Sequence, residues 1–221
     1  MMAAVGPGTG LGAVFMAHDT HTDSYLAHAS EGGMVPFAPQ SEVEWQLRQY
    51  LQRRDGHVTA EGVVSGPGLV NVFDFLVAER GGSGAVLAGV DRARGGAAAA
   101  VAEAALADAR AGRSSTALEA LDLFIDALVA HLRRTALHLL PTAGLYIAGG
   151  IAPKIRARLR QRVPQLFGEG CPVADPVMGE FIRDNVPLFL IENDDVGLLG
   201  ARIRAERLLR FEDGGSCRVL G

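Results

Sequence analysis

The sequence predicts an α/β layered domain, with a mixed sheet and flanking helices. Short apolar segments bounded by glycine turns indicate strands, and longer segments with apolar residues three or four positions apart indicate helices. The composition is that of a folded chain, because 48% of the 221 residues are hydrophobic and only 21% are charged. A globular chain of this length buries roughly 70% of its unfolded surface, so its core needs no disulfide or metal.

The N-terminal part of the chain is expected to form three short strands, over residues 3–5, 13–17 and 24–29. Glycine-rich turns separate them, and connections this short join antiparallel neighbours. These strands therefore predict a small antiparallel meander. Further strands are expected over residues 145–148 and 186–192. The segment 145–148 is fully apolar, which is typical of a strand that is buried on both faces.

A capping box predicts the first helix. Ser41 is placed to cap the helix, and Glu44 is placed to reach back to the Ser41 amide. Leu47 and Leu51 lie on the apolar face of this helix, which we expect to end at Gly56.

Later segments show the same helical periodicity. The longest helix is expected to begin after a cap at Ser114 or Ser115 and to end before Pro141. Residues 81–96 hold many glycines and are the best candidate for a mobile loop. A short helix is expected from Thr59 to the residue before Ser65. Further helices are expected over residues 69–79, 95–110 and 196–210, and in the arginine-rich stretch after Pro153.

Charge and cysteine content narrow the class of protein. The chain has 25 acidic and 21 basic side chains, a net charge of -4 that argues against binding to nucleic acid or to an anionic membrane. Its two cysteines, Cys171 and Cys217, are too few and too distant for a disulfide framework or a zinc cluster. No signal peptide and no apolar run of roughly 20 residues is present. We therefore expect a soluble, cytoplasmic protein.

Glycine turns are the features that could bind a nucleotide. The turn over residues 6–12 lies between two strands, so it lacks the helix of a Rossmann fingerprint, and it lacks the lysine of a P-loop. Its amides and the Thr9 hydroxyl are suited to phosphate oxygens, although a plain hairpin turn explains the pattern equally well. Taken alone, Gly149-Gly150 is more typical of a structural turn than of a binding site, and the turn over residues 65–68 is ambiguous.

A series of ordered blocks resembles the bacterial glucokinases, over nearly the whole chain. The resemblance implies the fold shared by hexokinase and actin, the actin-like ATPase (ribonuclease H-like) fold, with residues 1–221 forming the larger C-terminal lobe. The blocks are residues 6–12 (GPGTGLG), 31–33 (EGG), 37–39 (FAP), 57–61 (HVTAE), 65–71 (SGPGLVN), 147–151 (IAGGI) and 197–201 (GLLGA).

The resemblance also implies the residues of a site. Gly8, Thr9 and Gly10 match the second phosphate-binding turn for ATP, and Gly149 and Gly150 match a turn that makes room for the adenosine. Glu31 and Glu61 match carboxylates that accept hydrogen bonds from glucose hydroxyls, a role suited to charge-assisted bonding. Gly33 and Met34 complete the expected sugar contacts.

Some positions depart from the family pattern. Met34 stands where the family has a histidine that bonds a sugar hydroxyl, and a thioether accepts only weakly and cannot donate. Pro36 stands where the family has an aspartate, and residues 133–138 differ from a more apolar family helix. The family's first phosphate motif and its general-base aspartate have no match in residues 1–221, so no catalytic residue and no metal ligand is assigned here.

The implied activity is ATP-dependent phosphorylation of glucose to glucose 6-phosphate, the entry to glycolysis, with Mg²⁺ as a cofactor. The general base would come from an N-terminal lobe, supplied upstream or by a separate chain, and homodimerisation is a further expected partner arrangement. A catalytically inactive, glucokinase-like binding or interaction module is the alternative. The related ROK type is disfavoured, because it carries a cysteine–histidine zinc cluster that Cys171 and Cys217 cannot build.

Overall fold

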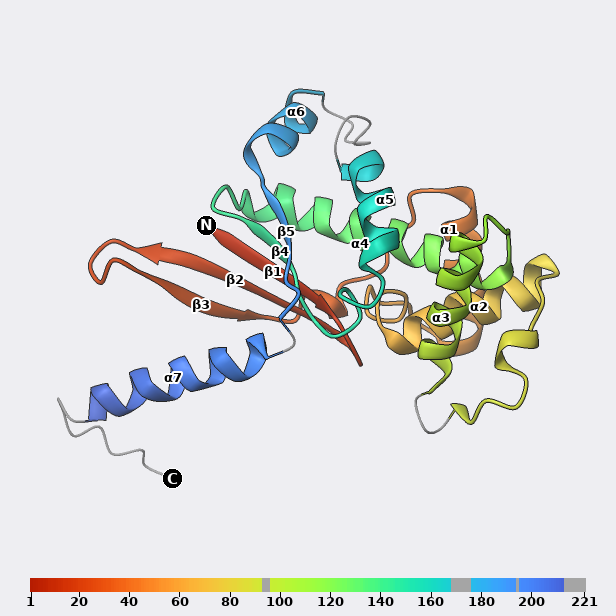
Figure 1. Cartoon of the computed structure of the whole chain (residues 1–221). Helices are drawn as coiled ribbons and strands as arrows, with labels where there is room; N and C mark the ends of the chain where they lie inside the picture. The colour runs from red at the N-terminus through yellow and green to blue at the C-terminus, as the bar shows by residue number, and fades with distance from the viewer. Residues whose placement is uncertain (93–95, 168–175, 194, 213–221) are drawn as a thin grey trace.

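The structure, a computed structural model, describes residues 1–92, 96–167, 176–193 and 195–212. Its centre is a five-stranded sheet with the strand order β3-β2-β1-β4-β5 (Figure 1). The predicted mixed sheet and its antiparallel N-terminal meander are confirmed. The strands are β1 (Met2–Pro7), β2 (Leu11–Asp19), β3 (Ser24–Ser30), β4 (Leu145–Ile147) and β5 (Leu188–Leu190).

The sheet has an antiparallel half and a parallel half that meet at β1. β1 and β2 pair antiparallel, with Pro7 opposite Leu11 at the end of the ladder, and β2 and β3 pair antiparallel as well. On its other edge β1 pairs parallel with β4, which places Val5 opposite Ile147. The C-terminal ends of β1 and β4 therefore lie together, each followed by one of the glycine turns.

Helices pack on the sheet and on one another. The long helix α4 contacts β1 and also packs against α2, α3, α5 and α6. Figure 1 shows α1, α2 and α3 gathered away from the β2–β3 hairpin, with α4 running between these two regions. The helices are α1 (Glu42–Asp55), α2 (Gly66–Arg80), α3 (Gly96–Arg110), α4 (Thr116–Leu139), α5 (Arg156–Phe167), α6 (Pro176–Asn185) and α7 (Val196–Glu212).

The predicted serine caps of α1 and α4 are confirmed, with one change of hydrogen-bond partner. The Ser41 side chain accepts a hydrogen bond from the Glu44 amide and caps α1. The Glu44 carboxylate, however, accepts from the Gln40 amide instead of the Ser41 amide, one residue further back than a capping box predicts. At the longest helix, Ser115 is the residue that caps α4.

The short helix expected from Thr59 is wrong. Residues 57–65 form turns and one isolated bridge, between Thr59 and Pro36. The amides of Ala60 and Glu61 donate to the carbonyls of Val35 and Gly33, so the backbone pairs with a distant segment.

Other predicted helices and loops differ from the structure in smaller ways. The sequence did not predict α6, and α2 begins at Gly66. The expected loop over residues 81–96 contains a 3-10 turn, η2 (Ala85–Leu87), that contacts α3. Residues 93–95 of that loop, Cys171 and Cys217 lie outside the described residues.

The last helix, α7, lies apart from the other helices (Figure 1). Large apolar side chains along it are exposed, including Leu198 at 73% and Leu209 at 61%. No helix among the described residues is long and apolar enough to cross a membrane.

Candidate functional site

The turn over residues 8–10 joins β1 to β2 and begins the candidate site. It is closed by a hydrogen bond of 2.8 Å from the Gly8 amide to the Gly10 carbonyl. Thr9 is exposed at its tip. Within the described part of the chain, the amides of Thr9 and Gly10 have no partner. Two adjacent amides and a hydroxyl at an exposed turn form a concavity suited to an anion.

The N-terminus of α2 lies directly against this turn. The Gly66 amide donates to the Gly8 carbonyl at 2.8 Å, and the Ser65 side chain caps the helix by accepting from the Gly68 amide. Helix N-termini carry a partial positive charge, which favours negative charge nearby. Sequence reasoning left the turn over residues 65–68 ambiguous, and its serine cap was the signal that a helix starts there.

A carboxylate flanks the other side of the turn. Glu61 accepts a hydrogen bond of 2.8 Å from the Leu11 amide through its Oε2 atom. A Cβ atom on Gly10 would lie 2.5 Å from that same oxygen, so only glycine leaves room for the carboxylate. The Gly10 position thus links the candidate phosphate turn to one of the two predicted sugar carboxylates.

Two distant segments run side by side next to Glu61. Glu61 donates its amide to the Gly33 carbonyl at 2.9 Å, and Phe37 donates its amide to the Val58 carbonyl at 2.9 Å. Pro36 faces Thr59 between these bonds, at a position where the ladder uses no amide from Pro36. The proline that departs from the family pattern is therefore compatible with the pairing that places Gly33 beside Glu61.

Glu31 and Met34 lie in the same segment. The 3-10 turn η1 (Gly32–Met34) begins after Glu31, whose carbonyl accepts from the Met34 amide at 2.9 Å. Both side chains are exposed, Met34 by 48%. Gly33 is buried, and a Cβ atom there would collide with the Leu11 carbonyl, so this position requires glycine. The structure thus brings the segment with Glu31, Gly33 and Met34 next to Glu61 and β2.

Gly149 and Gly150 follow β4 and lie beside the end of β1. Gly149 has a φ of 81°, and a Cβ atom on it would lie 2.5 Å from the Pro7 carbonyl oxygen. The missing side chain at Gly149 therefore makes room for β1. Gly150 is exposed and has open space where a Cβ atom would be, so it is the glycine of this pair that is free to face a ligand.

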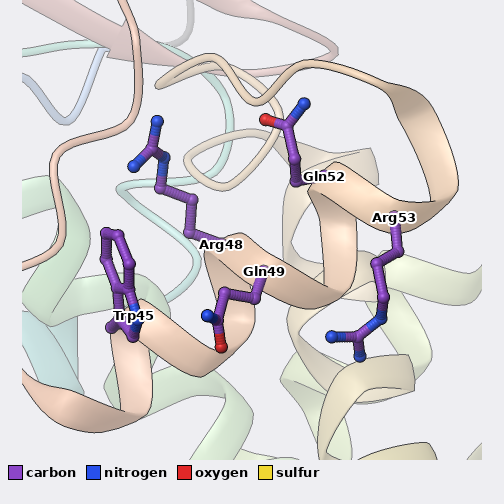
Figure 2. A pocket seen from close by; sticks show the side chains of 5 residues that line it. All are labelled: Trp45, Arg48, Gln49, Gln52 and Arg53. Atoms are coloured by element: carbon purple, nitrogen blue, oxygen red, sulfur yellow. The ribbon is translucent and has the colours of Figure 1, made fainter.

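A separate hollow lies on α1, as Figure 2 shows, with a volume of about 370 Å³. It is lined by side chains of this one helix: Trp45, Arg48, Gln49, Gln52 and Arg53. The Arg48 guanidinium lies 5.5 Å from the centre of the Trp45 ring, while Arg53 bonds Glu79. No predicted site residue lines this hollow, so the candidate site remains at the glycine turns.

Comparisons with known proteins agree with this geometry. A sequence-family model described as Glucokinase matches residues 1–208. A glucokinase of Nostoc sp. (strain PCC 7120) is 37% identical over 216 residues, which are 94% of this chain and 61% of that protein. The crystal structure of a glucokinase from an Antarctic psychrotroph has a TM-score of 0.70 at 26% identity, over 91% of this chain and 56% of that one.

A likeness at lower identity concerns the fold alone. A ROK family glucokinase from Streptomyces griseus, solved in complex with glucose and AMPPNP, has a TM-score of 0.55 at 16% identity. It covers 90% of this chain and 58% of that one. The fold is therefore that of the actin-like ATPases. Within this class, the chain belongs to the glucokinase family, and it spans about 61% of the length of the Nostoc relative.

Proposed function

We propose that this chain provides the nucleotide and sugar contacts of a cytoplasmic glucokinase, which phosphorylates glucose to glucose 6-phosphate with ATP at the entry to glycolysis. One observation supports this above the others: the glycine turn over residues 8–10 lies between the N-terminus of α2 and the Glu61 carboxylate. An anion-binding turn adjoins a hydrogen-bond acceptor for hydroxyls, which suits a reaction that joins a phosphate to a sugar.

In this proposal the two sides of the turn hold different reactants. The amides of Thr9 and Gly10 and the Thr9 hydroxyl would bind ATP phosphate oxygens, with Gly8 and the α2 N-terminus behind them. Glu61 would accept a hydrogen bond from a glucose hydroxyl. A carboxylate offers about four acceptor sites, and the bond from the Leu11 amide uses only one of them. Gly150 would face the adenosine.

Glu31 and the neighbouring Met34 would complete the sugar side. Glu31 would accept from a second hydroxyl, and its exposed carboxylate is consistent with that role. Gly33 would act through its carbonyl, which holds the Glu61 backbone in place. Met34 would contact the sugar without donating a hydrogen bond.

The residues present fit ATP, because unpartnered amides and open space lie where the phosphates and adenosine would be. Among the residues with described coordinates, no group of three or more potential ligands could hold a metal ion. Mg²⁺ keeps several waters and binds chiefly substrate phosphates, so it does not require such a group. When bound with ATP, it would neutralise charge on the phosphates.

The proposal assigns the general base to another part of the enzyme. Phosphoryl transfer needs both reactants held in line, and a second lobe, upstream or on a separate chain, would supply the aspartate that accepts the sugar proton. The exposed apolar side chains of α7 support a further contact surface in the active enzyme. A second lobe or a second copy of this chain would cover it.

A catalytically inactive binding module is the second candidate, favoured by Met34. Its exposed thioether occupies a position where a hydroxyl of a bound sugar would find no donor. Such a module would keep the ATP turn and lose glucose affinity.

Two measurements on the purified chain test both candidates. Calorimetry with glucose and with ATP separately should show binding of each, and Glu61→Gln should weaken glucose binding while leaving ATP binding unchanged. Glu103→Gln, on an exposed position of α3, is the matched control. Binding of ATP without glucose would favour the inactive module, and binding of neither would contradict the proposal. A coupled assay for glucose 6-phosphate then reports whether the chain alone turns over.

A further inference from the structure

A second cavity lies between the sheet and α4, behind the segment that carries Met34. Its volume is about 400 Å³, within the range of roughly 300–1,000 Å³ that is usual for small-molecule sites. The walls are contributed by β1 and β2, by the segment over residues 30–36 and by the last turns of α4. No residue of the turn over residues 8–10 lines it, and neither does Glu61.

The sheet side of this cavity is apolar and built from small and aromatic residues. Ala13 lies opposite Val5 and Ser30, and Phe15 lies opposite Ala3, so Ala13, Ser30 and Phe15 share the face of the sheet that carries the buried Ala3 and Val5. The small side chains of Ala13 and Ser30 leave the space open. Phe15 also lines the cavity, so an aromatic side chain forms part of the wall, and its ring stacks on the His28 ring with 5.1 Å between the ring centres.

The α4 side contains a polar atom without a partner. His131 is only 4% exposed and lines the cavity, and its Nδ1 atom has no hydrogen-bond partner among the described residues. That atom is itself closed off from the cavity by the protein around it, so His131 meets the cavity through the rest of its ring. Burial, with Arg134 nearby, lowers the pKa of His131 to about 4, so the imidazole is neutral at pH 7.

Positive charge also lies on the α4 side of the cavity. Arg134 and His138 line the cavity, and none of the described residues that line it carries a carboxylate. Arg134 donates from Nη1 to the Ala38 carbonyl at 3.2 Å, a bond that uses one of the five donors of a guanidinium and fixes its position. Glu44 on α1 is the carboxylate that acts on Arg134, and its own oxygen is engaged by the Gln40 amide.

We propose that this cavity binds a small monocarboxylic acid with an apolar body. The apolar body lies against Phe15 and Ala13, and the carboxylate accepts hydrogen bonds from the Arg134 guanidinium, with the His131 ring beside it. A neutral ligand would satisfy the apolar wall but would bring no negative charge to the Arg134 guanidinium. The site is distinct from the proposed ATP and glucose contacts.

Occupancy of the cavity is expected to reach the proposed sugar segment. Gly32, Val35 and Pro36 form part of the wall, and the Val35 carbonyl accepts from the Ala60 amide at 2.8 Å. A ligand that presses on this wall therefore changes the surroundings of Ala60, the residue next to Glu61. The Ala60 amide is therefore a second signal by which binding in the cavity can be detected.

The test uses 3-phenylpropionate as the probe and its amide, 3-phenylpropionamide, as the neutral match. Calorimetry on the 221-residue chain should show saturable binding of the acid with one site, and roughly tenfold weaker binding of the amide. Arg134→Gln should weaken acid binding by roughly tenfold or more, since the amide side chain retains a donor for Ala38 but not the charge. Ala13→Leu should abolish binding by filling the space.

Arg48→Gln, in the exposed hollow on α1, is the matched control and should bind the acid as the unaltered chain does. NMR should show the resonances of the His131 ring and of the Ala60 amide shifting when the acid is added. Equal binding of acid and amide, an equal loss in Arg48→Gln, or a His131 ring that does not respond would each overturn the proposal. Circular dichroism confirms that each variant is folded.

Discussion

The Glu61 carboxylate accepts a hydrogen bond from the Leu11 amide at 2.8 Å, although the two residues are 50 positions apart. This bond joins the beginning of β2 to the segment that follows α1, immediately beside the glycine turn. It fixes one oxygen of Glu61 and leaves the rest of the carboxylate available. The position of Glu61 is therefore set by the same turn that is proposed to bind phosphate.

Gly10→Ala tests this coupling. The new Cβ atom would lie 2.5 Å from Glu61 Oε2, so the flexible carboxylate must move and lose its bond to the Leu11 amide. We expect a loss of about 1–2 kcal/mol in the free energy of unfolding, measured with urea, and weaker glucose binding by calorimetry.

Gly8→Ala is the control for stability, because no atom lies within 4 Å of a Cβ atom there. It should change the free energy of unfolding by less than about 0.5 kcal/mol. A Gly10→Ala chain as stable as Gly8→Ala, with unchanged glucose affinity, would contradict the link between the turn and Glu61.

The two glycines after β4 should separate a structural role from a binding role. Gly149→Ala should destabilise the chain by about 2 kcal/mol or more, because it forces a positive φ and a close contact with the backbone of Pro7. Gly150→Ala should leave stability nearly unchanged and weaken ATP binding severalfold, since its Cβ atom enters open space beside the turn. Urea unfolding and calorimetry with ATP measure the two effects. A Gly150→Ala chain that binds ATP normally would remove Gly150 from the site.

Local signals in the sequence were enough to predict most elements of the fold. Ser41 and Ser115 cap α1 and α4, and the glycine turns separate the first strands where the sequence places them. These features depend on residues within a few positions of one another, so a sequence pattern contains them.

Contacts between distant segments were not predictable in the same way. Thr59 begins a segment with acceptable helical spacing, yet its backbone pairs with the strand-like stretch around Pro36. The bond from Leu11 to Glu61 and the approach of Gly149 to Pro7 also join residues far apart in sequence. The family resemblance named Glu61 and Gly149, but the reason for glycine at position 149 became visible only in three dimensions.

Met34→His should strengthen glucose binding. The substitution adds a ring nitrogen that donates and accepts, where the thioether offers only a weak acceptor. A hydrogen bond to a hydroxyl that otherwise stays unpaired contributes about 1 kcal/mol, so we expect roughly fivefold to tenfold tighter binding by calorimetry. Met34→Leu is the control and should bind glucose as the unaltered chain does. If histidine and leucine at position 34 give the same affinity, Met34 does not face the sugar.

His131 should make the chain less stable as the pH falls. Its pKa is lowered from the ordinary 6.5 to about 4, first by burial and second by Arg134. Between these values the unfolded chain binds the proton and the folded chain does not. The free energy of unfolding is therefore unaffected by this group above pH 6.5. It falls by on the order of 3 kcal/mol as the pH drops from 6.5 towards 4.

The comparison with His131→Leu isolates this effect from other titrating groups. Burial raises the pKa of Glu44 and of Asp126, and raised carboxyl pKa values change stability with pH in the opposite direction. Both groups remain in the variant, so subtracting the two stability curves cancels them. Urea unfolding at a series of pH values between 7 and 4 should show the unaltered chain losing more stability than His131→Leu. Parallel curves over this range would show that His131 takes up its proton in the folded chain as readily as in the unfolded one.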